Sequence, residues 1–269
     1  MNLHKIMMWA FIALVAVLLL SYIVSALNLP PQASETAQDA IVKSKPPDKE
    51  LLIFVHYNAK PGGGGGGKPS QCPYKTAGKW ATKNLSFSVN PNYQLTDESG
   101  NPLTSQQIVD VVASGFTPWE SSSGLNPPIV TTFSGLPSSY ANETMNGLNE
   151  ISWASLGSKG YTNAIAVTYY WRSRATKEIL EADIVNNNDS GFEWFAASPQ
   201  QGNPNDWQTA GTGKFDLPNI ETHEFGHFVG LDHASDAQHT MYAYSSVDEV
   251  KKRSLECGDI SGVQKLYGS

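Results

Sequence analysis

The chain has 269 residues, of which 40% are hydrophobic and 16% are charged, and its formal net charge is −7. This length is sufficient for one domain with a buried core plus extensions, and so low a charged fraction is unusual for a cytosolic globular protein. The acidic balance argues against nucleic acid as a partner. Two cysteines, Cys72 and Cys257, are too few for a cysteine-based zinc site.

The first 26 residues have the pattern of an export signal. Lys5 precedes an uncharged apolar run over residues 6–24, and Val24-Ser25-Ala26 suits cleavage after Ala26. The run is also close to the ~20 residues that span a bilayer. Residues 1–26 are therefore interpreted as a signal peptide, with an uncleaved signal anchor as the alternative. The rest of the chain is expected outside the cytoplasm, either secreted or anchored to a membrane.

Residues 27–70 are expected to form a flexible tether or a pro-segment. Residues 27–50 are polar and interrupted by prolines, and Gly62 to Gly67 form an unbroken run with maximal backbone entropy. The apolar residues 51–57 between them have strand character, and two interpretations stay open: a strand added to the domain, or a remnant of a pro-segment. The folded domain is expected to extend from residue 71 to residue 269.

Hydrophobic periodicity predicts a mixed α and β domain. Residues 85–90 alternate as a strand does, and residues 163–171 and 179–185 read as two strands joined by the polar turn 172–178. A strand such as 163–171 could pair with an extended peptide substrate, as edge strands do. Two helices are expected late in the chain.

One long helix is signalled after residue 103. Thr104 is placed to cap it and Gln107 to complete a capping box. Pro118 is expected to end this helix. Its inward face would use four apolar side chains: Ile108, Val111, Val112 and Phe116.

A second helix carries a candidate metal site. Residues 223–233 read His-Glu-Phe-Gly-His-Phe-Val-Gly-Leu-Asp-His, after Asp216 as a cap and Pro218 in the first turn. His223 and His227 are four residues apart, so they share one helix face and could hold one zinc ion. Glu224 stands beside the first ligand, within reach of a water on the metal.

Gly230 is expected to let the chain leave this helix in a left-handed conformation that a side chain would resist. That exit would bring His233 back to the same ion. Three neutral imidazoles leave a fourth position for water, as in catalytic rather than structural zinc sites. His239 is expected to be a structural or surface histidine, and His56 has no predicted partner.

This segment resembles the extended zinc motif of the metzincin metallopeptidases, H-E-x-x-H-x-x-G-x-x-H. His239-Thr240-Met241-Tyr242 lies where metzincins have their Met-turn, so Met241 would pack beneath the zinc site. Residues 255–268 are similar to the closing helix of the matrixin branch (peptidase family M10), and residues 181–185 to the strand before its active site. The resemblance covers about residues 72–269.

The resemblance implies an α+β fold of the metzincin type: a twisted mixed β-sheet, a long backing helix, an active-site helix and a C-terminal helix. It departs from the animal matrixins in residues 186–192, which contain no histidine for a second, structural zinc. Asp183, Asn188 and Asp189 could help to bind calcium, but a plain polar turn is the favoured interpretation. Position 258 is Gly where the family usually has Asp.

Outside the cytoplasm two cysteines usually pair, so a disulfide between Cys72 and Cys257 is predicted. The alternative is a Cys72 thiolate that blocks zinc from a pro-segment. The sequence around Cys72, Ser-Gln-Cys-Pro-Tyr, does not match the inhibitory motif of matrixins, and this favours the disulfide.

The resulting hypothesis is a zinc-dependent metalloendopeptidase that hydrolyses peptide bonds of extracellular proteins or peptides, with Glu224 as general base. Tyr242 and Tyr244 are candidates for the pocket wall, which we expect within residues 242–254. The alternative is a catalytically silent, zinc-stabilised extracellular binding module, which an intact Glu224 disfavours. Substrate preference and oligomeric state do not follow from the sequence.

Overall fold

The fold comes from a computed structural model that describes residues 41–44, 47–58, 72–196 and 212–269. The predicted export segment and the glycine run lie outside the described residues, whereas residues 41–44 and 47–58 of the expected tether are described. Within the described ranges, none of the helices combines the length and the apolar character needed to cross a bilayer.

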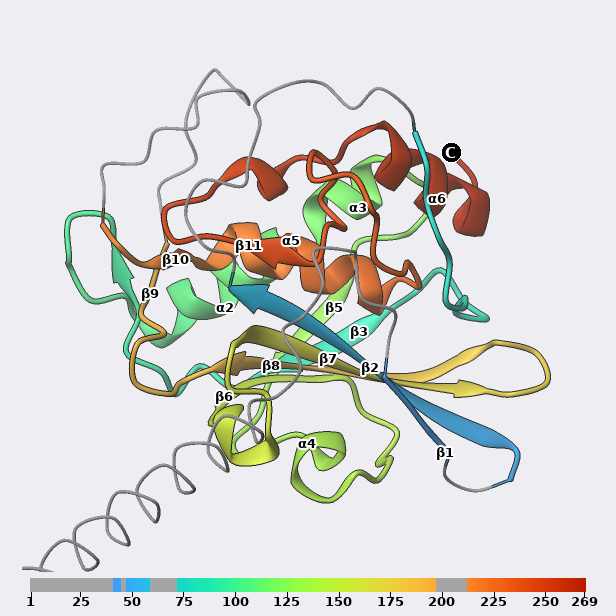
Figure 1. The fold of residues 1–269 in the computed structure, drawn as a ribbon, viewed down its shortest axis with the longest axis horizontal. Helices are drawn as coiled ribbons and strands as arrows, with labels where there is room; N and C mark the ends of the chain where they lie inside the picture. The colour runs from blue at the N-terminus through green and yellow to red at the C-terminus, as the bar shows by residue number, and fades with distance from the viewer. Residues whose placement is uncertain (1–40, 45–46, 59–71, 197–211) are drawn as a thin grey trace, which may run out of the picture. The chain divides into compact units, whose positions relative to one another are not determined.

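A twisted mixed sheet forms the centre of the fold (Figure 1). Four neighbouring strands, β5, β3, β6 and β8, run parallel to one another. Strands β7, β2 and β1 then continue the sheet in antiparallel fashion, and the short β11 pairs in parallel with β2. In sheet order the strands are β1 (Ile41–Ser44), β2 (Lys49–Asn58), β7 (Ala164–Ser173), β8 (Ile179–Asn187), β6 (Glu150–Ala154), β3 (Ser86–Val89) and β5 (Ile129–Thr132), with β11 (Tyr244–Ser245) on β2.

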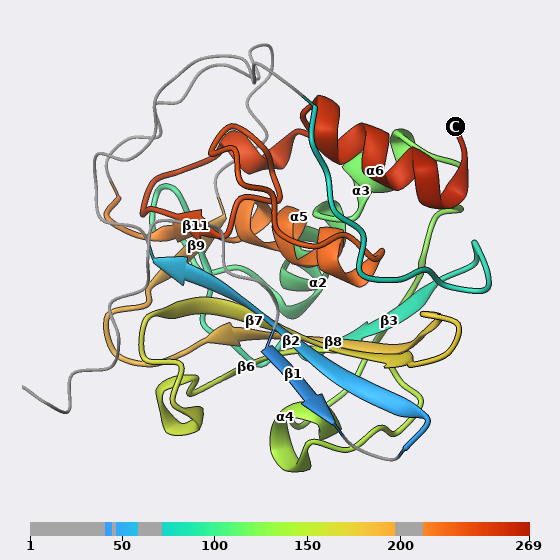
Figure 2. The same cartoon turned by 45° about the vertical axis from the view of Figure 1, so that its right-hand side comes forward.

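Most helices lie on one face of this sheet, and the short α4 lies on the other (Figures 1 and 2). A small second sheet has the order β10-β9-β4. The helices are α2 (Ser105–Ser114), α3 (Thr117–Ser121), α4 (Ser138–Asn142), α5 (Leu217–Phe228) and α6 (Cys257–Tyr267), with 3-10 turns η1 (Gly157–Lys159) and η2 (Lys251–Arg253); the small strands are β4 (Thr96–Asp97), β9 (Trp194–Ala196) and β10 (Phe215–Asp216). The predicted α+β class, with a backing helix α2, an active-site helix α5 and a C-terminal helix α6, is confirmed.

Strand β2 lies before the expected start of the folded domain at residue 71. Residues 49–58 were placed in the tether, yet they pair with β7 over nine residue positions. The two faces of β2 alternate between the two hydrophobic clusters that flank the sheet: Leu52 and Phe54 enter one, and Leu51, Ile53 and Val55 enter the other. Residues 51–57 thus form a strand of the sheet, and both interpretations of them allow this: a strand added to the domain, or a pro-segment held on the sheet edge.

The same strand occupies the edge of residues 163–171 that was expected to pair with an extended substrate. β7 is hydrogen-bonded on one side to β8 and on the other to β2. A third strand can pair with β7 only in place of one of these two, because each strand has two edges.

Helix α2 has the predicted start and a different end. Thr104 caps it, and the capping box with Gln107 is present. The helix ends at Gly115, before Pro118, which instead lies in the first turn of α3, where its missing N–H has no intrahelical partner to lose. The buried face uses Ile108, Val109 and Val112, with Val111 only half-buried.

The predicted disulfide is confirmed: Cys72 and Cys257 are bonded, with their Cα atoms 5.2 Å apart. It joins the segment that follows the linker to the first residue of α6. In the chain-entropy view a loop of this length contributes at most about 5 kcal/mol.

Strand β8 carries buried carboxyl groups that have a structural role. Asp183 is fully buried and its Oδ1 accepts from the backbone N–H of Glu150 (2.8 Å), whereas the Asp189 carboxylate accepts from the N–H of Gly157 (2.7 Å). Six residues of extended chain span about 20 Å, so Asp183 and Asp189 do not converge on one point. The proposed calcium site thus has no common centre formed by these two carboxylates.

Asp183→Asn is expected to reduce the loss of stability between pH 4 and pH 8. Burial raises the pKa of Asp183 from near 3.8 to about 8, so the folded state binds a proton over this interval that the unfolded state releases. Stability from this group is complete below the unfolded pKa and is lost as pH rises through the folded value, at up to about 1.4 kcal/mol per pH unit. Thermal unfolding at pH 5, 7 and 9 measures it, with the exposed Asp110→Asn as control; equal slopes for Asp183→Asn and the parent would contradict it.

Candidate metal centre

Helix α5 begins as predicted. The Asp216 carboxylate accepts from the N–H of Asn219 (3.1 Å), and Pro218 occupies the first turn. Arg253 adds two charge-assisted hydrogen bonds of 2.6 Å each to the same carboxylate, from Nε and from Nη2. Since every residue of α5 is buried, the helix axis is fixed from its first turn onward.

The predicted exit at Gly230 is also confirmed. Gly230 has φ +109°, in the region that favours glycine, and follows the C-cap residue Val229. The N–H of Leu231 donates to the carbonyl of Gly226, and that of Gly230 to the carbonyl of His227, both at 2.9 Å. This pair of bonds is a Schellman motif, and it turns the chain so that His233 returns toward the helix.

Three imidazoles converge where the sequence predicted. His227 Nε2 lies 3.2 Å from His223 Nε2 and 3.1 Å from His233 Nε2. Two of these rings are oriented by their other nitrogen: Nδ1 of His223 donates to the carbonyl of Thr240 (2.6 Å), and Nδ1 of His227 to that of Leu231 (2.9 Å). Their Nε2 atoms therefore carry lone pairs, directed at a shared point.

This donor set fits a zinc ion. Ligands at the Zn–N distance of 2.0–2.1 Å in a tetrahedral site are about 3.3 Å apart, close to the separations of His227 Nε2 from the Nε2 atoms of His223 and His233. Burial lowers the pKa of His223 and of His227 well below the ordinary value, which keeps both imidazoles neutral. Converging lone pairs repel one another unless a cation lies between them, so the residues present match a three-histidine metal site.

The turn around Met241 packs against helix α5 and orients one of these histidines. Asp259 of α6 accepts from the backbone N–H groups of Thr240 (2.9 Å) and Met241 (3.2 Å), and the Thr240 carbonyl orients His223. The Met241 sulfur lies against Gly226, where a Cβ atom would collide with it. Met241 is buried under the helix, as the resemblance implied.

The unusual Gly258 has a local explanation. A Cβ atom at this position would approach Nε2 of the buried His239 to 2.8 Å, and would also meet the carbonyl of Pro73. His239 is therefore a structural histidine that fills the space beside α6. It belongs to neither of the potential ligand groups among the described residues.

The Glu224 carboxylate is fully buried and both of its oxygens are engaged. Thr168 of β7 donates to Oε2 (2.6 Å), and Nδ1 of His56 from β2 donates to Oε1 (3.0 Å). Burial raises the pKa of Glu224 to about 8. Glu224 and His223 also lie close enough to His56 to form a second potential ligand group.

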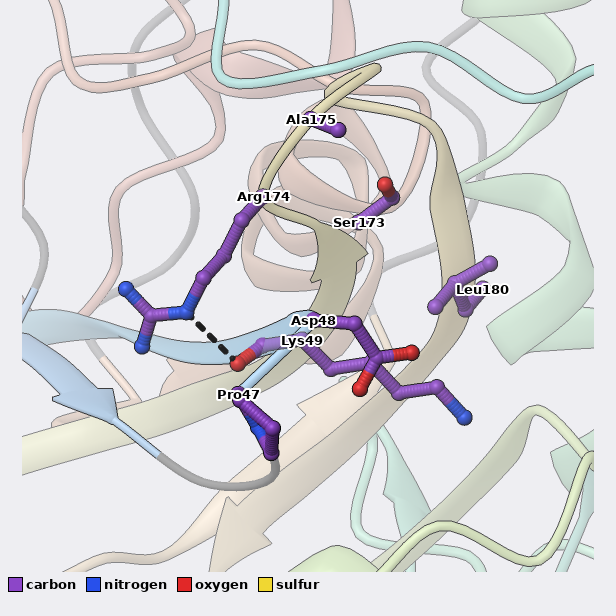
Figure 3. A pocket seen from close by; sticks show the side chains of 7 residues that line it. All are labelled: Pro47, Asp48, Lys49, Ser173, Arg174, Ala175 and Leu180. Carbon is purple, nitrogen blue, oxygen red and sulfur yellow. Dashed lines mark hydrogen bonds between the residues drawn. The ribbon is translucent and has the colours of Figure 1, made fainter.

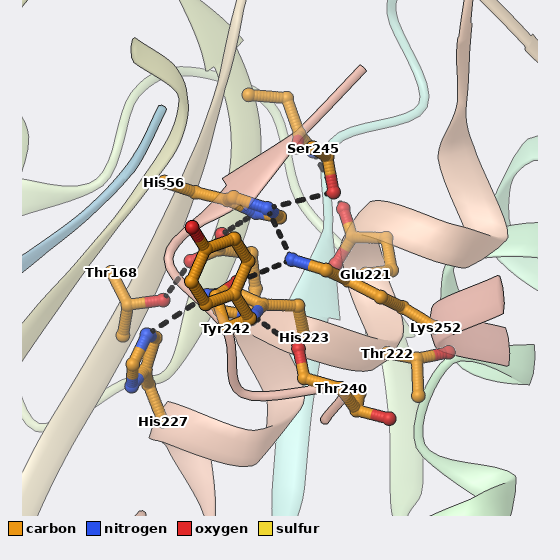
Figure 4. Close-up of polar contacts among 12 residues, drawn as sticks. His56, Thr168, Glu221, Thr222, His223, His227, Thr240, Tyr242, Ser245 and Lys252 are labelled. Carbon is orange, nitrogen blue, oxygen red and sulfur yellow. Dashed lines mark hydrogen bonds and ion pairs between the residues drawn. The ribbon is translucent and has the colours of Figure 1, made fainter. Parts of the chain in front are cut away.

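Three residues of this site were missed by sequence reasoning (Figure 4). His56 had no predicted partner, yet Nζ of Lys252 donates to its Nε2 (2.9 Å), and the Ser245 hydroxyl lies 3.1 Å from the same atom. Burial lowers the pKa of Lys252 to about 7. Thr168 and Lys252 carry no motif, and His56 lies 168 residues before Glu224, so no local pattern could have found them.

A separate pocket lies at the far end of the sheet, at the turns before β2 and between β7 and β8 (Figure 3). Nε of Arg174 donates to the carbonyl of Lys49 across it (3.1 Å). The pocket is separate from the histidine cluster, which contributes none of its lining residues. Its other lining residues come from the same two turns and are Pro47, Asp48, Ser173, Ala175 and Leu180.

The fold and the converging imidazoles define a candidate metal centre that is built on one helix and the turn that follows it. Residues 162–268 match the matrixin family model, so this part of the chain is similar to the matrixins. It is 44% identical over 57 residues to metalloendoproteinase 1 of Glycine max, which is 21% of this chain and 18% of the relative. It is 41% identical over 63 residues to human matrix metalloproteinase-27, which is 23% of this chain and 12% of the relative. The matched segments thus span less than a fifth of either relative.

Proposed function

We propose that the chain is a zinc-dependent metalloendopeptidase that hydrolyses proteins or peptides outside the cytoplasm. The observation that carries the proposal is the convergence of three Nε2 atoms beside the Glu224 carboxylate. His223, His227 and His233 would hold the ion. Bound zinc supplies Lewis acidity toward a carbonyl and toward water.

The chain's own residues supply the proton transfers. Glu224 would accept the proton of the attacking water and pass it to the leaving amine. Thr168 holds one oxygen of this carboxylate, which leaves the other to face the substrate once His56 is displaced.

The test is cleavage of casein and of quenched peptides before and after metal removal. A chelator is expected to abolish cleavage, and one equivalent of zinc per chain to restore it. Thermal unfolding should also shift to lower temperature without zinc, because the ion binds the folded state. A folded, matured protein that binds one zinc and cleaves nothing across a broad peptide library would support the alternative, a catalytically silent binding module.

A further inference from the structure

Strand β2 pairs with β7 along one edge, and with β1 and β11 along the other (Figures 1 and 2). It runs antiparallel to β7 from Lys49 onward, and its register with β7 shifts between His56 and Tyr57. There it pairs in parallel with β11, and the N–H of Tyr57 donates to the carbonyl of Ala243 (2.8 Å). This is the way in which an extended peptide adds to an exposed sheet edge.

The strand covers the metal centre with two of its rings. Phe54 stacks on His227, with ring centroids 4.1 Å apart and planes 12° from parallel, and His56 lies 3.8 Å from His223. The three predicted ligands and Glu224 are at most 1% exposed. No peptide bond can approach the ion while this strand is in place.

His56 makes a hydrogen bond to Glu224, the residue proposed as general base. Its Nδ1 donates to one carboxylate oxygen of Glu224. Its Nε2 accepts from Nζ of Lys252 and lies beside the Ser245 hydroxyl (Figure 4). The side chain thus fills the space between the general base, the first predicted ligand and the segment that leads out of β11.

We propose that residues 49–58 form an autoinhibitory strand, which occupies the peptide-binding edge of β7 with His56 over Glu224, and which must leave before the site can act. This inference rests on the proposed function. The uncut chain is then a latent form of the enzyme, in which residues 49–58 prevent substrate from reaching the site.

The packing of β2 indicates how release occurs. Its five apolar residues from Leu51 to Val55 are all buried, and burying each such side chain shifts an equilibrium by roughly 10- to 100-fold. Spontaneous undocking in the intact chain is therefore rare. A cut after β2 turns an intramolecular contact into one between two molecules, which dilution can separate, so we infer that release requires such a cut. The disulfide holds Cys72, close to the new N-terminus, against α6 when such a cut is made.

Glu50 forms ion pairs that hold the other end of β2, away from the metal centre, against β7 and the turn that follows β7. Its Oε1 accepts from Arg172 Nε (2.7 Å) and Lys177 Nζ (2.9 Å), and Arg174 lies 3.8 Å from Oε2. A cation at position 50 would face these three cations. Glu50→Lys should weaken the docking of β2 without touching the histidines or Glu224.

The experiment uses the full chain with Gly62–Gly67 replaced by the recognition sequence of a site-specific protease. It is made with and without Glu50→Lys, and with the exposed Glu98→Lys as a control of equal charge change. Before and after cutting, three quantities are measured on the zinc-loaded protein: retention of the N-terminal fragment in gel filtration, affinity for a small hydroxamate that chelates zinc, and cleavage of quenched peptides. A synthetic peptide of residues 47–58 is then added back, beside its His56→Ala version.

Cutting is expected to release the fragment and to tighten hydroxamate binding by at least about tenfold, since the competent fraction rises. Glu50→Lys should release more fragment than Glu98→Lys does. The added peptide should restore blockage, and its His56→Ala version should be weaker. If hydroxamate affinity is the same before and after cutting in every variant, or if the fragment stays bound in all of them, the autoinhibitory role is wrong. Tighter hydroxamate binding without any peptide cleavage would support the strand's role and contradict the peptidase.

Discussion

Glu224→Gln is expected to lower peptide cleavage by roughly 10²–10⁴-fold, the usual contribution of a general base, and to leave zinc binding intact. Glutamine keeps the size of the side chain and can still accept from Thr168, which donates to Oε2 at 2.6 Å. It cannot accept a proton from water. The imidazoles of His223 and His227 are oriented by the carbonyls of Thr240 and Leu231, not by Glu224, so the metal should remain.

The measurement is kcat/KM on a quenched peptide, with zinc content determined on the same samples after the strand has been released. The exposed Glu98→Gln controls for the loss of one carboxylate. A Glu224→Gln protein that keeps full zinc and retains parent activity would remove Glu224 from the mechanism. Loss of zinc together with activity would mean that the residue has a structural role.

The helix that carries the chemistry could be predicted from sequence because its signals are local. Asp216 caps it, Pro218 enters its first turn, and Gly230 ends it, each within one turn of the position at which it acts. A spacing of four residues fixes two ligands on one face whatever surrounds the helix. The histidine cluster therefore follows from a single continuous segment, and the turn at Gly230 supplies the third ring.

The parts that were predicted wrongly depend on contacts between distant segments. Nothing near residues 49–58 indicates that they pair with residues 164–173, because strand pairing is decided by packing across the sheet. The glycine run that follows β2 reads as a domain boundary, so the strand character of residues 51–57 left two interpretations open, an added strand and a pro-segment remnant. Pro118 was assigned to the end of α2 since a proline can stop one helix or start the next, and Gly115 decided between these roles.

Gly230→Ala is expected to destabilise the fold by roughly 2–6 kcal/mol, the sum of backbone strain and overpacking, and to weaken zinc binding. A residue with a side chain rarely adopts φ +109°, and a Cβ atom here would meet the carbonyl oxygen of Gly78. The Gly230 carbonyl also accepts from the N–H of Ala77 at 2.7 Å, so the turn cannot move away without losing this bond. Displacing it shifts His233 relative to the two helical ligands.

Gly100→Ala separates the two causes. Gly100 has φ +84°, but a Cβ atom at this position would find no heavy atom within 4 Å, so its substitution adds strain without a collision. Chemical unfolding and zinc titration of both variants measure the difference. If Gly230→Ala costs no more than Gly100→Ala and binds zinc like the parent, the close approach to Gly78 does not hold the turn. A larger cost at Gly230, with weaker zinc binding, would mean that the third histidine depends on packing between this turn and the segment that follows the disulfide.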